Sequence, residues 1–337
     1  MSPRSLQEYL FQQVKTKLPP HESLVDAIAE ALHLSNDSAY RRIRGETPLV
    51  LDEVKALCNR YTISLDHLLQ TRSNTTAFTL MRVNNRDHNF VQYWTDLLRT
   101  LQWVAGHQQK QIIYMTKDMP FIYNFSFRPI FAFRHFFWMK SILQHPDYIA
   151  RTFSVDCLPP QIEKLGREIL KVYNDIPSIE LWNTESFNAS LAQIEYYHEA
   201  GFFASDADAE MLYNTTRQLM QHLQQQAEWG CKFLPGENPS ARPSNYSFYY
   251  NRVVLGDNTI VIVHDDAKTL YLNYDVLDYM VTADETLCNE TYGKLQNLMR
   301  RSTLISSSGE KQRHHFFNLL YQKIPAPKHH PFNDMLP

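Results

Sequence analysis

Glycine and cysteine are both scarce in this sequence, and their scarcity removes several classes of protein. Only nine of the 337 residues are glycine, and none falls in a Gly-x-Gly-x-x-Gly, Walker A or Gly-x-Ser-x-Gly pattern. The four cysteines are Cys58, Cys157, Cys231 and Cys288, and no two of them stand at a metal-ligand spacing. The usual signatures of nucleotide binding, serine hydrolysis, structural zinc and disulfide frameworks are therefore missing. We expect a protein that is not an enzyme and that carries no cofactor and no metal.

Long hydrophobic runs are missing as well. The most apolar stretch, residues 129–143, is interrupted by Arg134, His135 and Lys140 and is shorter than the roughly 20 residues of a membrane-spanning helix. Residues 1–8 lack the apolar core of a secretory signal. We therefore expect no membrane partner and a cytoplasmic location, in which the cysteines stay reduced.

An excess of one charge is also missing, since the formal net charge is only −3. Residues 1–73 contain nine basic and nine acidic side chains, so any contact with nucleic acid must come from a local patch. Apolar residues, in contrast, make up 44% of the chain and aromatic residues 13%, which is enough to fill substantial cores. A chain of this length is expected to form two or three domains.

The pattern of apolar residues changes along the chain, which indicates a fold of class α plus α/β. Residues 1–70 predict a five-helix domain, the polar residues 71–76 a linker, residues 77–325 a larger mixed α/β domain, and residues 326–337 a loose tail. The larger domain has β-branched and aromatic runs that predict strands at 77–83, 111–116, 178–182, 246–255, 259–264, 269–273 and 302–305. Its predicted helices are 88–105, 129–145, 160–173, 186–200, 207–229, 287–301 and 309–324. Gly256-Asp257-Asn258 stands between two apolar runs and predicts a hairpin turn.

The most informative segment is residues 24–69. Apolar residues at Ile28, Ala29, Leu32 and Leu34 predict a short helix that ends in a tight turn. Ser35 then stands where a helix N-cap belongs, and a second helix follows over the next ten residues. Its polar first turn is Asn36-Asp37-Ser38, its arginines are Arg41, Arg42 and Arg44, and Gly45 stands at the position that ends it. Further helices are predicted at 51–61 and 64–69.

This arrangement resembles the helix-turn-helix family of lambda-repressor and Cro (XRE type), over residues 23–69 and without a gap. The resemblance implies a unit that binds double-stranded DNA through its second helix, which enters the major groove. It implies base contacts by a set of four residues, Asn36, Asp37, Ser38 and Arg41. It also implies phosphate contacts by Arg42, Arg44 and the amide groups at the start of that helix. Members of the family pair on palindromic sites, so the resemblance further implies a homodimer.

Three residues depart from the family pattern. His33 stands in the turn where the family often has glycine, so the turn must accommodate a side chain. Arg42 stands where an apolar residue is usual, so we expect either a rotated helix or a core face shifted toward Ile43. Asp37 places an acid beside the expected phosphates, so we expect weak non-specific binding.

Two polar clusters in the larger domain could ligate a metal or carry acid–base chemistry. Glu195 and His198 form a Glu-x-x-His pair on a predicted helix, but a second such pair is missing, which favours a solvated helix face. His264-Asp265-Asp266 follows a predicted strand, and a polar turn is the simpler interpretation of that segment.

The loop formed by Ser306, Ser307, Ser308 and Gly309 precedes the last helix, and its hydroxyl and amide groups could bind an anion. It loosely resembles the serine-glycine loop of sugar-isomerase domains, which bind phosphosugars, although Lys311 stands where those loops usually have threonine. The simpler alternative is a capping box between Ser307 and Glu310.

The aromatic run 131–138 has apolar residues on every side of the helix that it is expected to form. This pattern favours a central core helix, with a dimer interface or the wall of a ligand pocket as alternatives.

The sequence as a whole predicts a DNA-binding transcription regulator whose C-terminal domain senses a small-molecule effector, dimerises, or does both. Two alternatives remain open. One is a protein-interaction adaptor with a degenerate helix-turn-helix module. The other is an enzyme with an attached DNA-binding domain, against which the missing catalytic motifs argue.

Overall fold

The computed structural model describes residues 5–19, 22–61, 63, 65–69, 76–83, 90–253 and 255–325. The chain divides into two compact units, Met1–Phe78 and Thr79–Pro337. Of the predicted linker only Thr76 is among the described residues, and the predicted tail 326–337 lies outside them. None of the helices in the described part of the chain combines the length and the apolar composition that crossing a bilayer requires.

The smaller unit is helical. Its helices are α1 (Leu6–Lys17), α2 (Leu24–Leu32), α3 (Asn36–Ile43), α4 (Leu51–Tyr61) and α5 (Leu65–Leu69). A capping box starts α1, because Ser5 Oγ accepts from the Glu8 amide while Glu8 Oε2 accepts from the Ser5 amide. The helices bury one apolar cluster that consists of Leu10, Phe11, Val14, Ile28, Ala29, Ala39, Leu57, Cys58 and Leu68.

The larger unit is built on one mixed sheet of eight strands in the order β1-β7-β6-β5-β2-β3-β4-β8. The strands are β1 (Thr79–Met81), β2 (Lys110–Met115), β3 (Ser178–Trp182), β4 (Tyr246–Tyr250), β5 (Thr259–His264), β6 (Ala267–Asn273), β7 (Tyr279–Thr282) and β8 (Thr303–Leu304). The pairs β2–β3 and β3–β4 are parallel, and the remaining neighbours are antiparallel.

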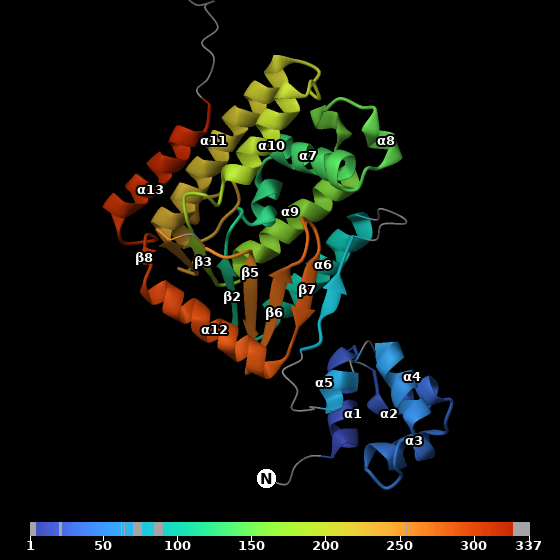
Figure 1. Cartoon of the computed structure of the whole chain (residues 1–337). Helices are drawn as coiled ribbons and strands as arrows, with labels where there is room; N and C mark the ends of the chain where they lie inside the picture. Colours follow the sequence, from blue (N-terminus) through green and yellow to red (C-terminus); the bar gives the residue numbers. More distant parts are fainter. Residues whose placement is uncertain are drawn as a thin grey trace, which may run out of the picture. The chain divides into compact units, whose positions relative to one another are not determined.

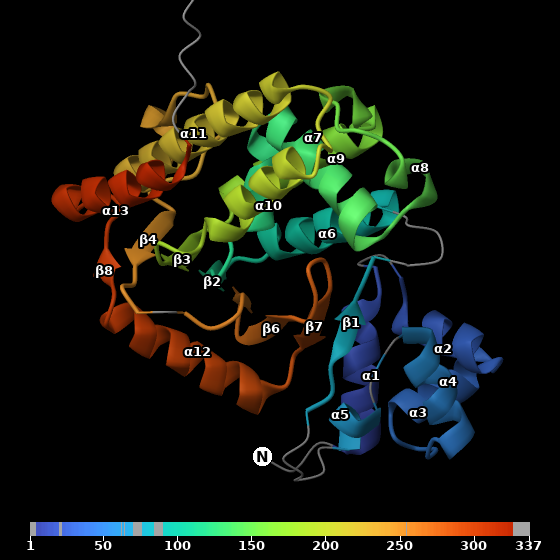
Figure 2. The same ribbon diagram turned by 45° about the horizontal axis from the view of Figure 1, so that its top comes forward.

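Helices cover both faces of this sheet. They are α6 (Phe90–Ala105), α7 (Arg128–Phe137), α8 (Pro146–Ile149), α9 (Pro160–Asp175), α10 (Asn188–Glu199), α11 (Asp206–Trp229), α12 (Glu285–Arg300) and α13 (Glu310–Lys323). Short 3-10 turns η1 (Phe121–Ser126), η3 (Val155–Cys157) and η4 (Pro239–Ala241) and a π-helical turn η2 (Trp138–Ile142) complete the unit. Figures 1 and 2 show α12 on one side of the sheet and α6, α9, α10 and α11 on the other. The mixed helix and sheet class predicted from the sequence is therefore confirmed.

The alternation of side chains along the strands divides the interior into two apolar cores. On β2, Ile112 faces the large core with α6, α7 and α9, whereas its neighbour Ile113 faces α12. On β5, Ile262 belongs to the large core and Val261 to the core beside α12. The predicted strands are all present, most of them with shifted ends. Strand β7 was not predicted, because its four residues follow a polar segment and are too few to show alternation.

The predicted hairpin at Gly256-Asp257-Asn258 is wrong. Strand β4 lies between β3 and β8, so both of its edges are occupied and it cannot pair with β5. Strand β5 instead lies between β2 and β6. The chain between β4 and β5 thus crosses over β3 and β2 within the sheet. Turn-forming residues such as Gly256-Asp257-Asn258 are compatible with a crossover as well as with a hairpin.

The true hairpin joins β5 to β6 at the segment His264-Asp265-Asp266. His264 pairs with Ala267, and Asp265 has the positive φ (48°) that a two-residue hairpin loop needs. The Asp265 amide donates to Gln109 O at 2.7 Å, and Asp265 Oδ1 accepts from the Gln109 amide at 3.1 Å. The interpretation of this segment as a polar turn is therefore confirmed.

The aromatic run 131–138 forms a core helix, as the sequence favours. Phe131, Phe133, Phe136 and Trp138 on α7 and η2 are each at most 1% exposed. Gly166 allows α7 to pack closely against α9, since a Cβ at position 166 would lie 2.5 Å from Phe131 Cε1.

We predict that Gly166→Ala lowers the free energy of unfolding of the larger unit by about 1–3 kcal/mol, because the added methyl group collides with Phe131 and Phe125. Gly293→Ala on α12 is the matched control. A Cβ there meets no atom within 4 Å, so the better helix propensity of alanine should stabilise that variant by about 1 kcal/mol. Urea unfolding followed by tryptophan fluorescence measures both effects, since all five tryptophans lie after residue 79. Equal effects of the two substitutions would contradict the close packing of α9.

Candidate functional site

Helices α2 and α3 are joined by a tight turn at His33-Leu34-Ser35. His33 caps α2 in the left-handed conformation (φ 54°, ψ 45°), and its amide donates to the carbonyl groups of Ala29 and Glu30. Ser35 is the N-cap of α3, with its Oγ accepting from the Ser38 amide at 3.4 Å. The turn thus accommodates a residue larger than glycine: the His33 backbone adopts the strained left-handed conformation, and its side chain is exposed to solvent.

Small side chains bring α2 and α3 together. Ala29 on α2 is 7% exposed and Ala39 on α3 is fully buried, and both belong to the cluster formed with Ile28 and Leu57. Alanine at these positions lets the helix axes approach closely. The opposite face of α3 is consequently left toward solvent.

That exposed face carries the residues predicted to contact bases. Asn36, Asp37 and Arg41 are exposed and Ser38 is half-buried. Three of them have partners within the protein: Asn36 Nδ2 donates to Asp26 Oδ1 on α2 at 2.8 Å, and Arg41 Nε lies 3.7 Å from Asp37 Oδ2. Ion pairs this exposed contribute little stability, so these groups can exchange partners readily.

The Arg44 side chain is also exposed to solvent. Its guanidinium lies 3.3 Å from Glu46 Oε1 with about half of both side chains exposed, and its Cζ stands 5.6 Å from the centre of the Tyr40 ring. The Tyr40 side chain is itself 49% exposed. A cation held beside an exposed aromatic ring suits contact with a phosphate backbone.

Arg42 has a different position from the one predicted. Its guanidinium makes a two-pronged interaction with Glu53 on α4, at 3.1 Å from Nε and 2.8 Å from Nη2, and both side chains are only 16% exposed. Its third group, Nη1, donates to Ser38 O. Because each nitrogen of the guanidinium has a partner within the protein, the predicted phosphate contact of Arg42 would require this ion pair to open. Glu53 explains how an arginine fits where the resembling family has an apolar residue.

The end of α3 is fixed by two features, of which only one was predicted. Gly45 is left-handed (φ 76°), with the Gly45 amide donating to Arg42 O and the Glu46 amide to Arg41 O, which is a Schellman ending. Gln7 on α1 holds the next residues, since its amide donates to Arg42 O and Thr47 O while its Oε1 accepts from the Leu49 amide. Sequence reasoning missed Gln7, because its partners lie at least 35 positions away.

The larger unit contains a second polar centre, which the sequence did not reveal. The Glu180 carboxylate on β3 is fully buried and accepts four hydrogen bonds. The donors are the hydroxyls of Tyr123 and Tyr173 at 2.6 Å, Trp182 Nε1 at 2.8 Å and the Tyr246 hydroxyl at 2.9 Å. Burial, reinforced by the negative charge of Glu180, raises the pKa of all three tyrosines well above 10, so they remain protonated donors.

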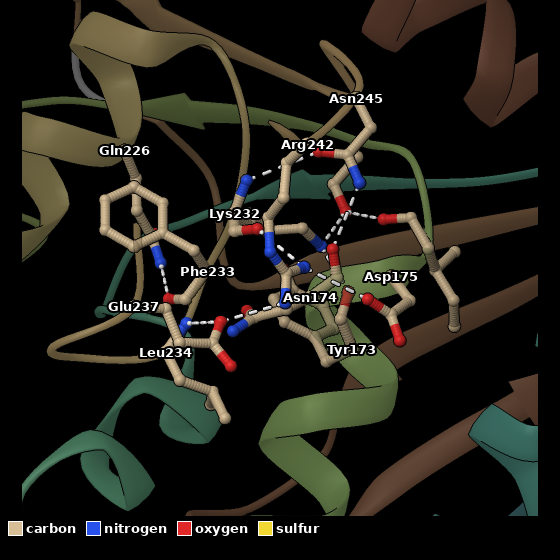
Figure 3. A network of polar contacts seen from close by, with 12 residues as sticks. Tyr173, Asn174, Asp175, Gln226, Lys232, Phe233, Leu234, Glu237, Arg242 and Asn245 are labelled. Atoms are coloured by element: carbon tan, nitrogen blue, oxygen red, sulfur yellow. Dashed lines mark hydrogen bonds and ion pairs between the residues drawn. The ribbon is translucent and has the colours of Figure 1, made fainter. Parts of the chain in front are cut away.

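Lys232 is also fully buried, and it shares Tyr173 with this centre. Figure 3 shows Lys232 within a polar network that includes Tyr173, Asp175 and Arg242. Its Nζ donates to Tyr173 O at 2.6 Å and to Ser178 Oγ, and it stands 3.6 Å from the centre of the Tyr173 ring. Burial lowers the pKa of Lys232 to about 7, against the opposing effect of Glu180. Around it, Arg242 contacts Asp175 and the Lys232 carbonyl and so ties this loop to the end of α9.

The predicted anion-binding loop is occupied by contacts within the protein. The Ser306 Oγ accepts from the Phe248 amide, the Ser307 amide donates to Ala227 O, and buried Arg313 donates to the Ser308 carbonyl. The predicted capping box is wrong, because left-handed Gly309 is the N-cap of α13 and no side chain caps the helix. The loop precedes α13 in the chain, and its hydrogen bond from Ser307 to Ala227 holds it against the end of α11.

The other candidate clusters do not form metal sites. His198 Nε2 lies 3.0 Å from Asp206 Oδ1 on an exposed surface, and Glu195 is exposed. The residues that the structure describes contain no group of three or more His, Cys, Asp or Glu side chains placed to hold a metal.

We predict that His33→Gly makes the α2–α3 segment more stable by about 0.5–1 kcal/mol, because glycine adopts a positive φ without steric cost. Gly45→Ala should have the opposite sign and a size of about 1 kcal/mol, since its added Cβ meets nothing and only the backbone strain remains. Hydrogen–deuterium exchange of the amides in 24–44 measures both. Slower exchange in Gly45→Ala than in the wild type would contradict the left-handed ending of α3.

We predict that Lys232→Met removes a pH dependence of the stability of the larger unit. The pKa of Lys232 is about 7 in the folded chain and near 10.5 when unfolded, so the unfolded state binds more protons between these values and the wild-type unfolding free energy rises with pH there. The stability difference between wild type and variant should shift by about 1 kcal/mol per pH unit from pH 7 to 9. Urea titrations at pH 7, 8 and 9 test this, with exposed Lys164→Met as control. A constant difference would show that Lys232 titrates as an ordinary lysine.

Comparison with known proteins found no match to the chain among family models, curated proteins or solved structures.

Proposed function

We propose that this protein is a DNA-binding transcription regulator that acts as a homodimer, with the smaller unit contacting DNA and the larger unit sensing a small molecule. The observation that carries the proposal is the exposed face of α3. Its first turn presents Asn36 and Asp37 to solvent one helical turn before Arg41, while Ala39 is buried against α2. Helices that contact bases in a major groove pack one face against the protein and expose polar side chains near their N-terminus, and α3 has both features.

The charges of α3 support moderate rather than strong affinity. Arg41 and Arg44 are each paired with an exposed acid, so binding to phosphates requires these weak pairs to open. With Arg42 held by Glu53, few cations remain to neutralise phosphates. Sequence-specific contacts to bases would therefore carry a large share of the selectivity, and affinity should fall with salt along a shallow slope.

The mechanism proposed for regulation follows from the division into two units. Two copies of α3 in a homodimer would meet successive major grooves when their separation matches one DNA turn. An effector bound more tightly by one arrangement of the larger unit shifts the population toward it and so changes that separation. A protein-interaction adaptor is the alternative function, and it predicts that no duplex sequence is selected.

We predict that selection from random duplexes recovers a palindromic site, and that Arg41→Ala weakens binding to it by about 5- to 150-fold without changing stability. The double variant Arg42→Met/Glu53→Gln should bind within about twofold of wild type, because Arg42 makes no phosphate contact in this proposal. Its uncharged side chains keep the shape of the pair, and the side-chain oxygen of the introduced glutamine can still accept from the Val50 amide, as Glu53 does. Fluorescence anisotropy at several salt concentrations measures both affinities and slopes.

The two variants separate the possible outcomes. Loss of binding in the double variant with retained stability would return Arg42 to the phosphate contacts. Recovery of no preferred duplex, together with equal and salt-independent binding by wild type and Arg41→Ala, would exclude the DNA-binding function and favour the adaptor.

A further inference from the structure

Three exposed arginines lie at the edge of the sheet where β4 and β8 pair (Figure 1). Arg252 follows β4, whereas Arg300 ends α12 and Arg301 caps that helix just before β8. The two segments are joined beside these residues, because Asn251 Nδ2 donates to Ser302 Oγ at 2.8 Å. Arg252 and Arg301 each stand one residue beyond that contact. We refer to Arg252, Arg300 and Arg301 as the arginine group.

The fold holds Arg252 in place without neutralising it. Tyr250 on β4 pairs with Thr303 on β8, and Arg252 comes two residues after Tyr250. Because side chains two apart on an extended chain share a face, the Arg252 guanidinium reaches the Tyr250 ring, with Cζ 5.9 Å from the ring centre. The ring is buried at 7% exposure, so it orients the guanidinium at the surface of the sheet edge.

Acidic partners distinguish these arginines from other exposed ones. Arg99 on α6 and Arg167 on α9, for example, each pair with a carboxylate one helical turn away. Among the described residues no carboxylate lies within ion-pair distance of any member of the arginine group, and Arg300 Nη1 has only Asn297 Oδ1 at 3.5 Å. The positive charge of the group is therefore not compensated locally.

The surrounding sequence has the same bias. Residues 243–256 contain one basic residue and residues 291–309 contain three, so the two segments that meet at β4 and β8 carry four basic residues and no acid. The acids of α12, Glu285 and Glu290, lie in its first half, and exposed Lys294 stands about two helical turns before Arg301. The whole chain has a net charge of −3, so this positive region is a local feature.

Stabilisation of the fold explains only part of the arginine group. A cation at the C-terminal end of a helix is favoured by the helix dipole, which accounts for Arg300 and Arg301 on α12. It does not account for Arg252, which follows a strand and adds a third like charge at the same sheet edge. Like charges close together destabilise a fold, so we look for a partner of opposite charge.

A duplex backbone suits this surface better than a single small anion. Each arginine is exposed, so one anion held by one of them would gain little, whereas a regular row of phosphates engages several at once. The planar guanidinium binds phosphate with two parallel hydrogen bonds, and hydroxyl donors such as that of exposed Thr303 accompany such contacts. The smaller unit also offers few free cations, since Arg41 and Arg44 are paired with acids.

We propose that the arginine group binds the phosphate backbone of duplex DNA without reading its bases and supplies electrostatic affinity that α3 lacks. The inference rests on the proposed function, because it gives the larger unit a share in binding the same class of partner. The site would contribute equally to every sequence, while selectivity stays with the exposed face of α3.

The salt dependence of duplex binding by the full chain tests the site. Fluorescence anisotropy compares wild type with Arg252→Gln/Arg301→Gln and with the control Arg99→Gln/Arg167→Gln, which removes the same two charges from exposed positions elsewhere. Each lost phosphate contact should reduce the slope of log affinity against log salt by about 0.9. From about 50 to 200 mM salt the wild type should therefore weaken roughly 10-fold more than the first variant. The control should keep the wild-type slope.

A charge-preserving variant supplies the second arm. Arg252→Lys/Arg301→Lys keeps both cations and should keep most of the slope. All three double variants should unfold at the wild-type urea concentration within error, since the substituted side chains are exposed. An unchanged slope in Arg252→Gln/Arg301→Gln, an equal loss in the Arg99 and Arg167 control, or a complete loss in the lysine variant would each overturn the proposal.

Failure of this site and failure of the proposed function give different results. A palindromic site that Arg41→Ala weakens, bound by Arg252→Gln/Arg301→Gln with the wild-type slope, would leave the function intact and exclude the phosphate contact. Salt-dependent binding to every duplex without a preferred sequence, lost in that double variant but not in Arg41→Ala, would do the reverse. Tighter arginine-dependent binding to phosphatidylserine vesicles or to polyglutamate than to duplex would overturn the choice of DNA as the partner.

Discussion

The interior of the larger unit depends on one buried carboxylate. Glu180 lies in the middle of the sheet, and moving its charge out of water is tolerated only because four donors surround it. Those donors come from η1, α9, β3 and β4, so the same interactions that satisfy the charge also fix the relative positions of four elements. Tyr173 illustrates this: its hydroxyl donates to Glu180, while its carbonyl and its ring both contact the buried Lys232 ammonium. A polar network therefore fixes these elements together with apolar packing.

The sequence predicted the features that depend on neighbouring residues. Ser35 and Gly45 mark the start and end of α3, because a capping hydroxyl and a left-handed glycine act within one helical turn. Strands β3 and β5 have the predicted bounds, because their β-branched and apolar side chains fill both sides of a covered sheet. The aromatic run 131–138 was recognised as a core helix for a similar reason, since no orientation of such a helix leaves a polar face.

The features that failed depend on partners distant in sequence. The apolar runs around Gly256-Asp257-Asn258 are compatible with a hairpin, and only the positions of β3 and β8 exclude it. The ion pair of Arg42 was not predicted, because its partner Glu53 lies on the next helix, beyond the reach of any pattern within α3. Glu180 stands within a short strand like many half-exposed acids, and the tyrosines that bury it lie as far away as Tyr246. Local pattern thus predicts elements, while pairing and the polar sites depend on which elements meet.

Strand β1 is the first element of the larger unit and directly follows the smaller unit in the chain. It has only three residues and lies at the edge of the sheet, paired with β7 alone, so few hydrogen bonds oppose its release. A regulator of the kind proposed above needs an element that can change state without disturbing the central strands, and β1 meets that requirement because it pairs with β7 alone. Strand β8 is even shorter and lies at the other edge, but it stands between α12 and α13 in the chain and is far in sequence from the smaller unit.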